Sequence, residues 1–375
     1  WQTGKVTSME SMFVGARKFN NDLSSWTTNN VINLGDMFRG AQAFNGDISK
    51  WLTSKVTNMY RTFETASIFN RDLNWDTSSV TTMQEMFSGA SVFNRDLSAW
   101  QTAKVTTMKQ MFKSASNFNG DVSTFQTDEV IDLSGMFQDA SAFNGDLSKW
   151  KTAKVLKMDY IFNGASLFNS NISNWQTGKV TDMGAMFEYT AVFNSDISGW
   201  QIGKVVNMGS MFNGAAGFNC DLSKWQTGDV VDMNYLFKGA STFNGDVSTW
   251  QTGKVTKMNM MFNSASAFNG DLSNWQTSNV IQMQEMFLGT KAFNGNITLW
   301  KTENVADMGS MFYGAEVFNN DVSKWLTFSV TNMNGMFKSA SAFNGDISLW
   351  ETSNVVDMDS MFLGASAFNG NITLW

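Results

Sequence analysis

The sequence contains no histidine, no proline and a single cysteine. Histidine is the base in most nucleophilic triads, so we find no catalytic constellation and expect no enzyme activity. Without proline the chain lacks a residue that commonly fixes tight turns. One cysteine cannot build a disulfide framework within a chain. Cys220 stands where other copies of a repeat carry Gly, Asn, Ser or Arg, so we assign it no role.

Two further absences exclude classes of partner. No apolar run approaches about 18 residues, so the sequence predicts no membrane span. The chain carries 26 Lys and Arg against 33 Asp and Glu, a formal net charge of -7. It therefore has no basic stripe that could neutralise phosphates, and we expect no nucleic-acid partner.

One motif is repeated throughout the sequence without a linker. Its first copy runs from Trp1 to Ser25 and reads WQTGKVTSMESMFVGARKFNNDLSS. Fifteen copies follow one another, of which fourteen have 25 residues and the third, residues 51–74, has one fewer. We number the positions of each copy from 1 to 25. Self-similarity at this period predicts a single repeat array over residues 1–375, with fifteen stacked coils, no linkers and no evident capping repeats.

The apolar positions of each copy have the spacing of a helix. Apolar residues fall at positions 6, 9, 12, 13 and 16. Position 8 carries Ser, Thr, Asn or Asp in twelve copies, and position 15 is Gly in nine, as at the start and end of helices. We therefore predict a helix of about two turns over positions 9–14. The stretch from Asp22 to Trp26 predicts a short strand, and stacked strands would lie about 4.8 Å apart in a parallel sheet.

This pattern predicts an α/β solenoid, a leucine-rich-repeat-like stack with one short strand and one short helix in each coil. The alternative is an all-β solenoid, in which the helix is only a turn. The third copy lacks one residue before Trp75. There we predict a local break in the hydrogen-bond pattern of the sheet over residues 72–76, with the stack otherwise continuous.

The motif also resembles a known family. The run F-N-x-D-(I/L)-S-x-W-x-T-x-x-V-x-x-M-x-x-M-F resembles a bacterial-surface repeat of about 26 residues, found in mycoplasma lipoproteins and in wall-anchored proteins of Gram-positive bacteria. Its V-x-x-(M/I)-x-x-x-F pattern is similar to the BspA-type leucine-rich repeats of surface adhesins. The resemblance covers all fifteen copies. It implies an extracellular or cell-surface protein with a leucine-rich-repeat-like fold and no enzyme activity.

A row of carboxylates is the first candidate site. Position 22 is Asp in twelve copies, and carboxylates at the coil spacing repel by about 1 kcal/mol per pair in water. Calcium could offset this repulsion, because it binds carboxylate and carbonyl oxygens. The alternative is that each Asp accepts backbone amides in its own turn, near Lys at position 5, and this needs no cofactor. The calcium row would include Asp22, Asp47, Asp96, Asp121 and Asp146.

Three more rows recur at single positions. Position 1 is Trp except at Phe125, and we favour a core row over exposed rings that stack on sugars. Position 20 is always Asn, which predicts a structural hydrogen-bonded ladder. Position 3 is Thr except at Ile202. A Thr row could face ice, but one row beside variable neighbours is poor evidence for it.

Three copies carry Asn in place of Asp at position 22. Because position 24 is Ser or Thr in these copies, each change creates an N-x-(S/T) sequence. Asn171, Asn296 and Asn371 are therefore glycosylation candidates, and the product could be a glycoprotein.

Positions 2, 10, 14, 17, 18 and 25 vary freely between copies, which argues against one repeated ligand site. We therefore predict a non-enzymatic extracellular structural protein. Since the first and last copies are as regular as the others, we expect end-to-end assembly of the chain with itself into a surface filament or layer. The alternative is a monomeric cell-surface adhesin or binding module that uses one solenoid face for a host protein or glycan.

Overall fold

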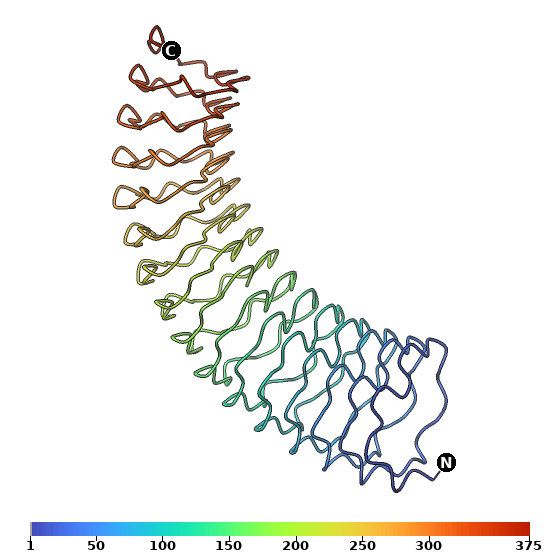
Figure 1. Cartoon of the computed structure of the whole chain (residues 1–375). Coiled ribbons are helices and arrows are strands. Elements are labelled where there is room, and N and C mark those ends of the chain that lie inside the picture. The colour runs from blue at the N-terminus through green and yellow to red at the C-terminus, as the bar shows by residue number, and fades with distance from the viewer. Residues whose placement is uncertain (1) are drawn as a thin grey trace. The chain divides into compact units, whose positions relative to one another are not determined.

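The computed structural model describes residues 2–375, so Trp1 lies outside the described residues. The chain forms two compact units, Trp1–Val180 and Thr181–Trp375. In each unit every copy of the repeat makes one coil, and the coils lie one on the next (Figure 1). We number the coils as the copies.

Parallel bridges join the coils at position 8. They run from Ser8–Asn33 to Asp132–Lys157 in the first unit, and from Asp182–Asn207 to Asn332–Asp357 in the second. Each bridge involves one residue per coil, and no multi-residue strand and no helix occurs in residues 2–375. No helix long and apolar enough to cross a membrane is therefore found in this part of the chain.

The predicted α/β fold is wrong. Positions 10–15 form consecutive turns in place of the helix, and positions 22–26 form no strand within the described residues. The turn that the all-β alternative placed at positions 9–14 is present, but the strands of that alternative are not. The leucine-rich-repeat-like arrangement of one helix and one strand per coil is therefore excluded.

Two left-handed residues in each coil prevent a helix. Position 11 has a positive φ in every coil, for example 58° at Ser11, and so does position 15, for example 70° at Gly40. An L-residue in this conformation cannot continue a right-handed helix. Glycine at position 15 resembles a helix C-cap, but it serves equally well in a left-handed turn. The sequence gives no such signal at position 11, where only Gly135 and Gly335 are glycines.

Backbone N–H groups in these turns alternate between two kinds of partner. The N–H groups of positions 12, 14 and 16 donate to carbonyls three residues back in the same coil, as from Met12 to Met9. Those of positions 9, 11, 13 and 15 donate to the next coil, as from Phe13 to Met37 at 2.8 Å. The alternation satisfies the buried backbone and joins the coils at the same time.

Aromatic rings form continuous columns inside each unit. Phe38 stacks on Phe63 of the next coil with ring centroids 5.5 Å apart, and on Phe44 of its own coil at 4.0 Å. Trp51 and Trp75 stack at 6.2 Å. Burying one such side chain contributes about 1.5–3 kcal/mol. Because every ring contacts the coil next to it, this stabilisation depends on stacking and is lost in an isolated coil.

The short third copy loses one turn and keeps its place in the stack. In a regular copy the N–H at position 1 donates to the carbonyl three residues back, as from Trp100 to Leu97 at 2.9 Å. Trp75 follows Leu73 after a single residue and makes no such bond within the described residues. It still stacks on Trp51 at 6.2 Å. The predicted break in a sheet is therefore wrong, because residues 72–76 form no sheet, and the missing residue instead removes one turn bond.

Serine at position 15 should be strained where glycine is not. Ser114 has a φ of 55°. We expect Ser114→Gly to raise the free energy of unfolding by about 0.5–1 kcal/mol, because relief of the left-handed strain exceeds the entropy that glycine loses on folding. Ser116→Gly is the matched control. It removes a hydroxyl that donates to the Ser91 carbonyl at 3.3 Å, so it should lower stability. Chemical denaturation measures both, and a destabilised Ser114→Gly protein would contradict the argument.

Candidate functional site

The Thr row at position 3 is buried and does not face solvent. Thr152 is 0% exposed. Its hydroxyl donates to the carbonyl of Gln176 at 3.1 Å and accepts the N–H of the same residue at 2.7 Å. One side chain thus pairs with both backbone groups of a residue in the next coil. Because the Thr row is buried, it cannot form an ice-binding surface.

The Asn and Trp rows are structural as well. A hydrogen-bonded Asn ladder occurs in each unit, but a backbone N–H, and not a second side-chain amide, is the donor. The N–H of Asn45 donates to Asn20 Oδ1 at 2.8 Å, and that of Asn244 to Asn219 Oδ1 at 2.8 Å. The Trp row lies in the core, as favoured. Trp100 is 2% exposed, and its indole Nε1 donates to the carbonyl of Leu73 at 3.0 Å. Phe125 keeps the ring stack, at 6.3 Å from Trp150, but has no N–H to donate.

A fourth row was missed in the sequence. Position 17 varies, yet it is Ser in nine copies. Ser116 and Ser141 each donate their hydroxyl to the position-17 carbonyl of the preceding coil, at 3.3 and 3.2 Å. The frequency of Ser was the available signal, but it was masked by Ala, Lys, Glu, Gln and Arg in the other copies.

The Asp row accepts hydrogen bonds within its own turns. Asp146 Oδ1 accepts the N–H of Ser148 at 2.9 Å. Because bonds from the backbone and side chain of Ser148 favour the charged form, they lower the pKa of Asp146 against the opposing effect of burial. The calcium candidates Asp22, Asp47, Asp96 and Asp121 make the same turn bond at 2.8–2.9 Å.

No group of three or more His, Cys, Asp or Glu side chains that could hold a metal ion occurs among residues 2–375. The turn bonds already account for the position-22 carboxylates, so calcium is not needed to explain them. Whether the row binds calcium in solution stays a prediction.

The glycosylation candidates lie on the surface. Asn171, Asn296 and Asn371 are exposed, and each Oδ1 accepts the N–H of the residue two positions on. Asn therefore replaces Asp without loss of the turn. Whether these three residues carry glycans stays a prediction, which the intact mass of the native protein checks.

Cys220 is half-buried, and its Sγ lies 3.6 Å from Asp196 Oδ1. Burial raises the pKa of the thiol, and the nearby carboxylate acts in the same direction. A thiol that stays protonated at neutral pH is a poor nucleophile and a poor metal ligand.

Another surface with large varied side chains is at positions 10, 11, 14 and 15, which we call the turn face. It carries all five tyrosines of the chain: Tyr60, Tyr160, Tyr189, Tyr235 and Tyr313. Tyr160 and Tyr189 are 45% and 59% exposed. Cations lie over other rings of this face, as Lys238 does over Tyr235 at 5.2 Å. Tyrosine is thus separated from the buried Trp and Phe columns.

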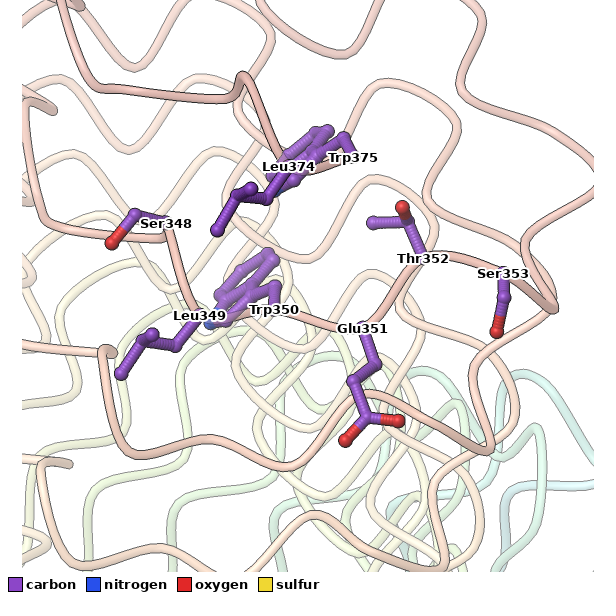
Figure 2. A pocket seen from close by; sticks show the side chains of 8 residues that line it. All are labelled: Ser348, Leu349, Trp350, Glu351, Thr352, Ser353, Leu374 and Trp375. Atoms are coloured by element: carbon purple, nitrogen blue, oxygen red, sulfur yellow. The ribbon is translucent and has the colours of Figure 1, made fainter.

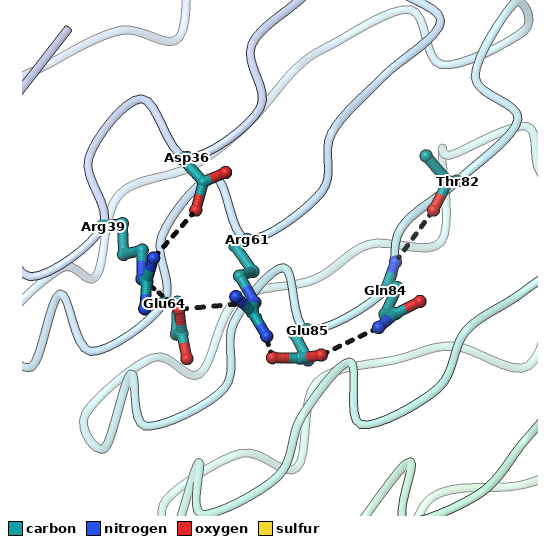
Figure 3. A network of polar contacts seen from close by, with 7 residues as sticks. All are labelled: Asp36, Arg39, Arg61, Glu64, Thr82, Gln84 and Glu85. Atoms are coloured by element: carbon teal, nitrogen blue, oxygen red, sulfur yellow. Dashed lines mark hydrogen bonds and ion pairs between the residues drawn. The ribbon is translucent and has the colours of Figure 1, made fainter. Parts of the chain in front are cut away.

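The densest ionic cluster on the turn face spans coils 2 to 4 (Figure 3). Arg39 Nε lies 2.7 Å from Glu64 Oε2, and Arg61 Nε lies 2.7 Å from Glu85 Oε2. Burial of Glu85 opposes its ionisation, but hydrogen bonds from Arg61 and Gln84 outweigh this effect and lower its pKa. Because these ion pairs connect successive coils, the cluster stabilises the contact between them.

Recesses also open between coils beside the Trp row. Figure 2 shows one of about 500 Å³ in coils 14 and 15, where Trp350 and Trp375 stack with ring centroids 6.3 Å apart. Leu349 at its rim is 73% exposed. A second recess of about 370 Å³ has the same register beside Trp275. Leucine at position 25 lines both recesses, as Leu349 and Leu299 do, together with polar side chains of positions 2 to 4.

Coils that stack on one another and are joined by rows of side chains at positions 1, 3, 17 and 20 define a tandem-repeat protein. Its sequence matches a family described as "Mycoplasma protein of unknown function, DUF285" over residues 1–74, 73–170, 145–230, 218–325 and 294–375. The chain belongs to this family. The resemblance to a mycoplasma-type repeat family is thereby confirmed.

Other comparisons add little. A comparison with curated proteins finds no match. Among solved structures the chain is similar to one titled "Crystal structure of TLR13-ssRNA13 complex", with 9% identity and a TM-score of 0.26. The similarity covers 93% of this chain and 62% of that chain. A likeness this low carries no argument about fold or ligand.

The Thr row should be sensitive to loss of its hydroxyl. We expect Thr152→Val to lower the free energy of unfolding by about 1–3 kcal/mol, because it removes the hydroxyl that pairs with both the N–H and the carbonyl of Gln176. Thr152→Ser keeps the hydroxyl and should lower the free energy of unfolding much less. Chemical denaturation compares the two, and equal losses would show that packing rather than hydrogen bonding holds this position.

The lowered carboxyl pKa values predict acid sensitivity. The folded pKa values of Asp47, Asp96 and Asp146 lie below 3.8, so the unfolded chain binds protons first as the pH falls. This contribution to stability is present above pH 3.8, and it is lost as the pH falls through the pKa values of the folded protein. Changing all three to Asn keeps the turns, as Asn171 does, and should flatten the fall in unfolding temperature between about pH 5 and pH 3. An unchanged slope in the triple variant would contradict this.

Proposed function

We propose that the chain is a non-enzymatic structural repeat protein of the cell exterior that builds a surface filament or layer. The main support is that most of the strongly repeated polar and aromatic positions join one coil to the next, while the Asp row at position 22 is used within its own turns. The Thr, Asn and Trp rows and the Phe columns all act in this way. A repeated ligand site would need repeated side chains that remain unused. The exterior location rests on the resemblance to bacterial-surface repeats.

The contact between coils has the symmetry that extended growth requires. One edge of a coil donates N–H groups at positions 9, 11, 13 and 15, and the facing edge of the next coil accepts them. Such a heterologous contact does not close on itself, so units add in one direction. Its geometry hardly changes along the chain, since stacked Trp centroids are 6.2 Å apart at Trp26–Trp51 and 6.4 Å at Trp325–Trp350.

A second function, binding of a host protein or glycan by one face, is favoured by the turn face. Tyr is a common anchor of binding surfaces. Position 11 also keeps large side chains in a strained conformation, for example Tyr160 with a φ of 57°. Strain retained at an exposed position supports a role for the side chain itself.

Assembly distinguishes the two functions. We expect the native protein to form rods longer than one chain, visible by negative-stain electron microscopy and sedimenting faster than the 41.7 kDa chain at micromolar concentration. A single monomeric species would contradict the filament and favour the binding module. Protease treatment of intact cells tests the exterior location, because an external array is digested while cytoplasmic proteins survive.

A further inference from the structure

A hollow of about 290 Å³ opens on the turn face of coils 5 to 7, within the first unit. It lies at Gly135, which occupies the left-handed position 11 with a φ of 59°. Thirteen of the fifteen coils carry a side chain at this position. A Cβ at residue 135 would lie 3.1 Å from Gln110 Cγ and 3.3 Å from Gln138 Oε1. Both distances are close contacts, so the side chains of Gln110 and Gln138 lie directly against Gly135 and form the wall of the hollow there.

The hollow brings cations and an aromatic ring together. Lys109, Lys113 and Tyr160 line it. Neither ammonium group has a carboxylate partner within 4.0 Å among the described residues. Tyr160 is 45% exposed, so part of this side chain is accessible to a ligand in the hollow.

A fixed carboxylate completes the lining. Asp159 Oδ1 accepts the hydroxyl of Ser134 at 2.6 Å, and Ser134 is only 5% exposed. The backbone supports both residues, because the N–H of Gly135 donates to the Asp159 carbonyl at 2.8 Å. The carboxylate is thus held in place before any ligand arrives, which lowers the entropy lost on binding.

We propose that this hollow binds one acidic monosaccharide unit of a glycan, of the uronic acid type. The Tyr160 ring offers an apolar face for a sugar ring. Asp159 and the two Gln amides offer acceptors and donors for hydroxyl groups. Lys109 and Lys113 would form charge-assisted hydrogen bonds with the sugar carboxylate.

Size and charge both select this ligand class. Ligand pockets usually measure about 300–1,000 Å³, so a hollow at the lower limit suits one sugar ring. Two ammonium groups against one carboxylate favour an anion over a neutral sugar. The inference rests on the second function proposed above, binding by the turn face, and it names the ligand and the site.

Gly335 provides a matched control within the chain. It occupies the same position 11 with the same φ of 59°. The nearest atom to a Cβ there is Ser310 Oγ at 3.2 Å, and Lys338 lies over the Tyr313 ring at 5.0 Å. This equivalent place has one lysine, which is already engaged with a ring.

Isothermal titration of the full chain with methyl glucuronide tests the site. Gly135→Gln introduces the residue that position 11 carries at Gln110, so it fills the hollow with a side chain that another coil accepts. We expect it to weaken binding at least about tenfold, or by about 1.4 kcal/mol, while Gly335→Gln leaves binding unchanged. Unfolding temperatures of both variants show that each is folded.

Charge is tested separately with a ligand pair and a double variant. Methyl glucoside differs from methyl glucuronide only in carrying a neutral hydroxymethyl group in place of the carboxylate, and we expect it to bind at least about tenfold more weakly. Lys109→Gln with Lys113→Gln should abolish this preference. Equal binding of both sugars by the unaltered chain, or no binding of the glucuronide, would overturn the inference.

The outcomes separate this site from the wider function. If the chain binds acidic glycans but Gly135→Gln has no effect, the site is wrong while binding by another part of the surface stands. If the chain binds host proteins and no sugar, the ligand class is wrong while the binding function stands. If it binds neither, both the inference and the second function fail, and the filament proposal is unaffected.

Discussion

The alternating backbone hydrogen bonds at positions 9–16 are the interaction on which the whole structure depends. In a helix all of these N–H groups would donate to carbonyls of the same coil, and in a sheet all of them would donate to carbonyls of neighbouring coils. Here a left-handed residue at positions 11 and 15 turns the chain so that every second N–H reaches the next coil, as from Phe13 to Met37. The coil is therefore completed only by its neighbour, and the array is stable as a stack.

Side chains supply the bonds that the missing strands would have supplied. The Thr hydroxyl at position 3, the Ser hydroxyl at position 17 and the Asn amide at position 20 each pair with backbone of an adjacent coil, as Thr152 does with Gln176. The Trp indole pairs with a carbonyl as well. This explains why positions 1, 3 and 20 are nearly as constant as the apolar core, and why a constant polar row in such a protein is weak evidence for a ligand.

As a consequence for function, the side chains fall into two groups: rows that join the coils, and the turn face, which varies from coil to coil. Rows that join coils use their polar groups for bonds to the adjacent coil, and the position-22 carboxylates accept N–H groups of their own turns, as Asp146 does. The turn face differs because its side chains change from coil to coil while its backbone does not. At Gly135 the turn face has a hollow with polar walls. Function can thus vary along the array without any change in the interior.

The sequence alone determined the period, the coil boundaries, the family, the core positions and the Asn ladder, because each of these leaves a residue at a fixed place in every copy. It could not determine the fold of the coil. Apolar residues at positions 9, 12, 13 and 16 suit a helix and this chain of turns equally well, and Ser11 or Tyr160 gives no sign of a positive φ. The burial of the Thr row, the bonding at position 17 and the hollow at Gly135 were decided only by the tertiary structure. Each depends on which groups of the next coil lie opposite, and a single copy does not contain that information.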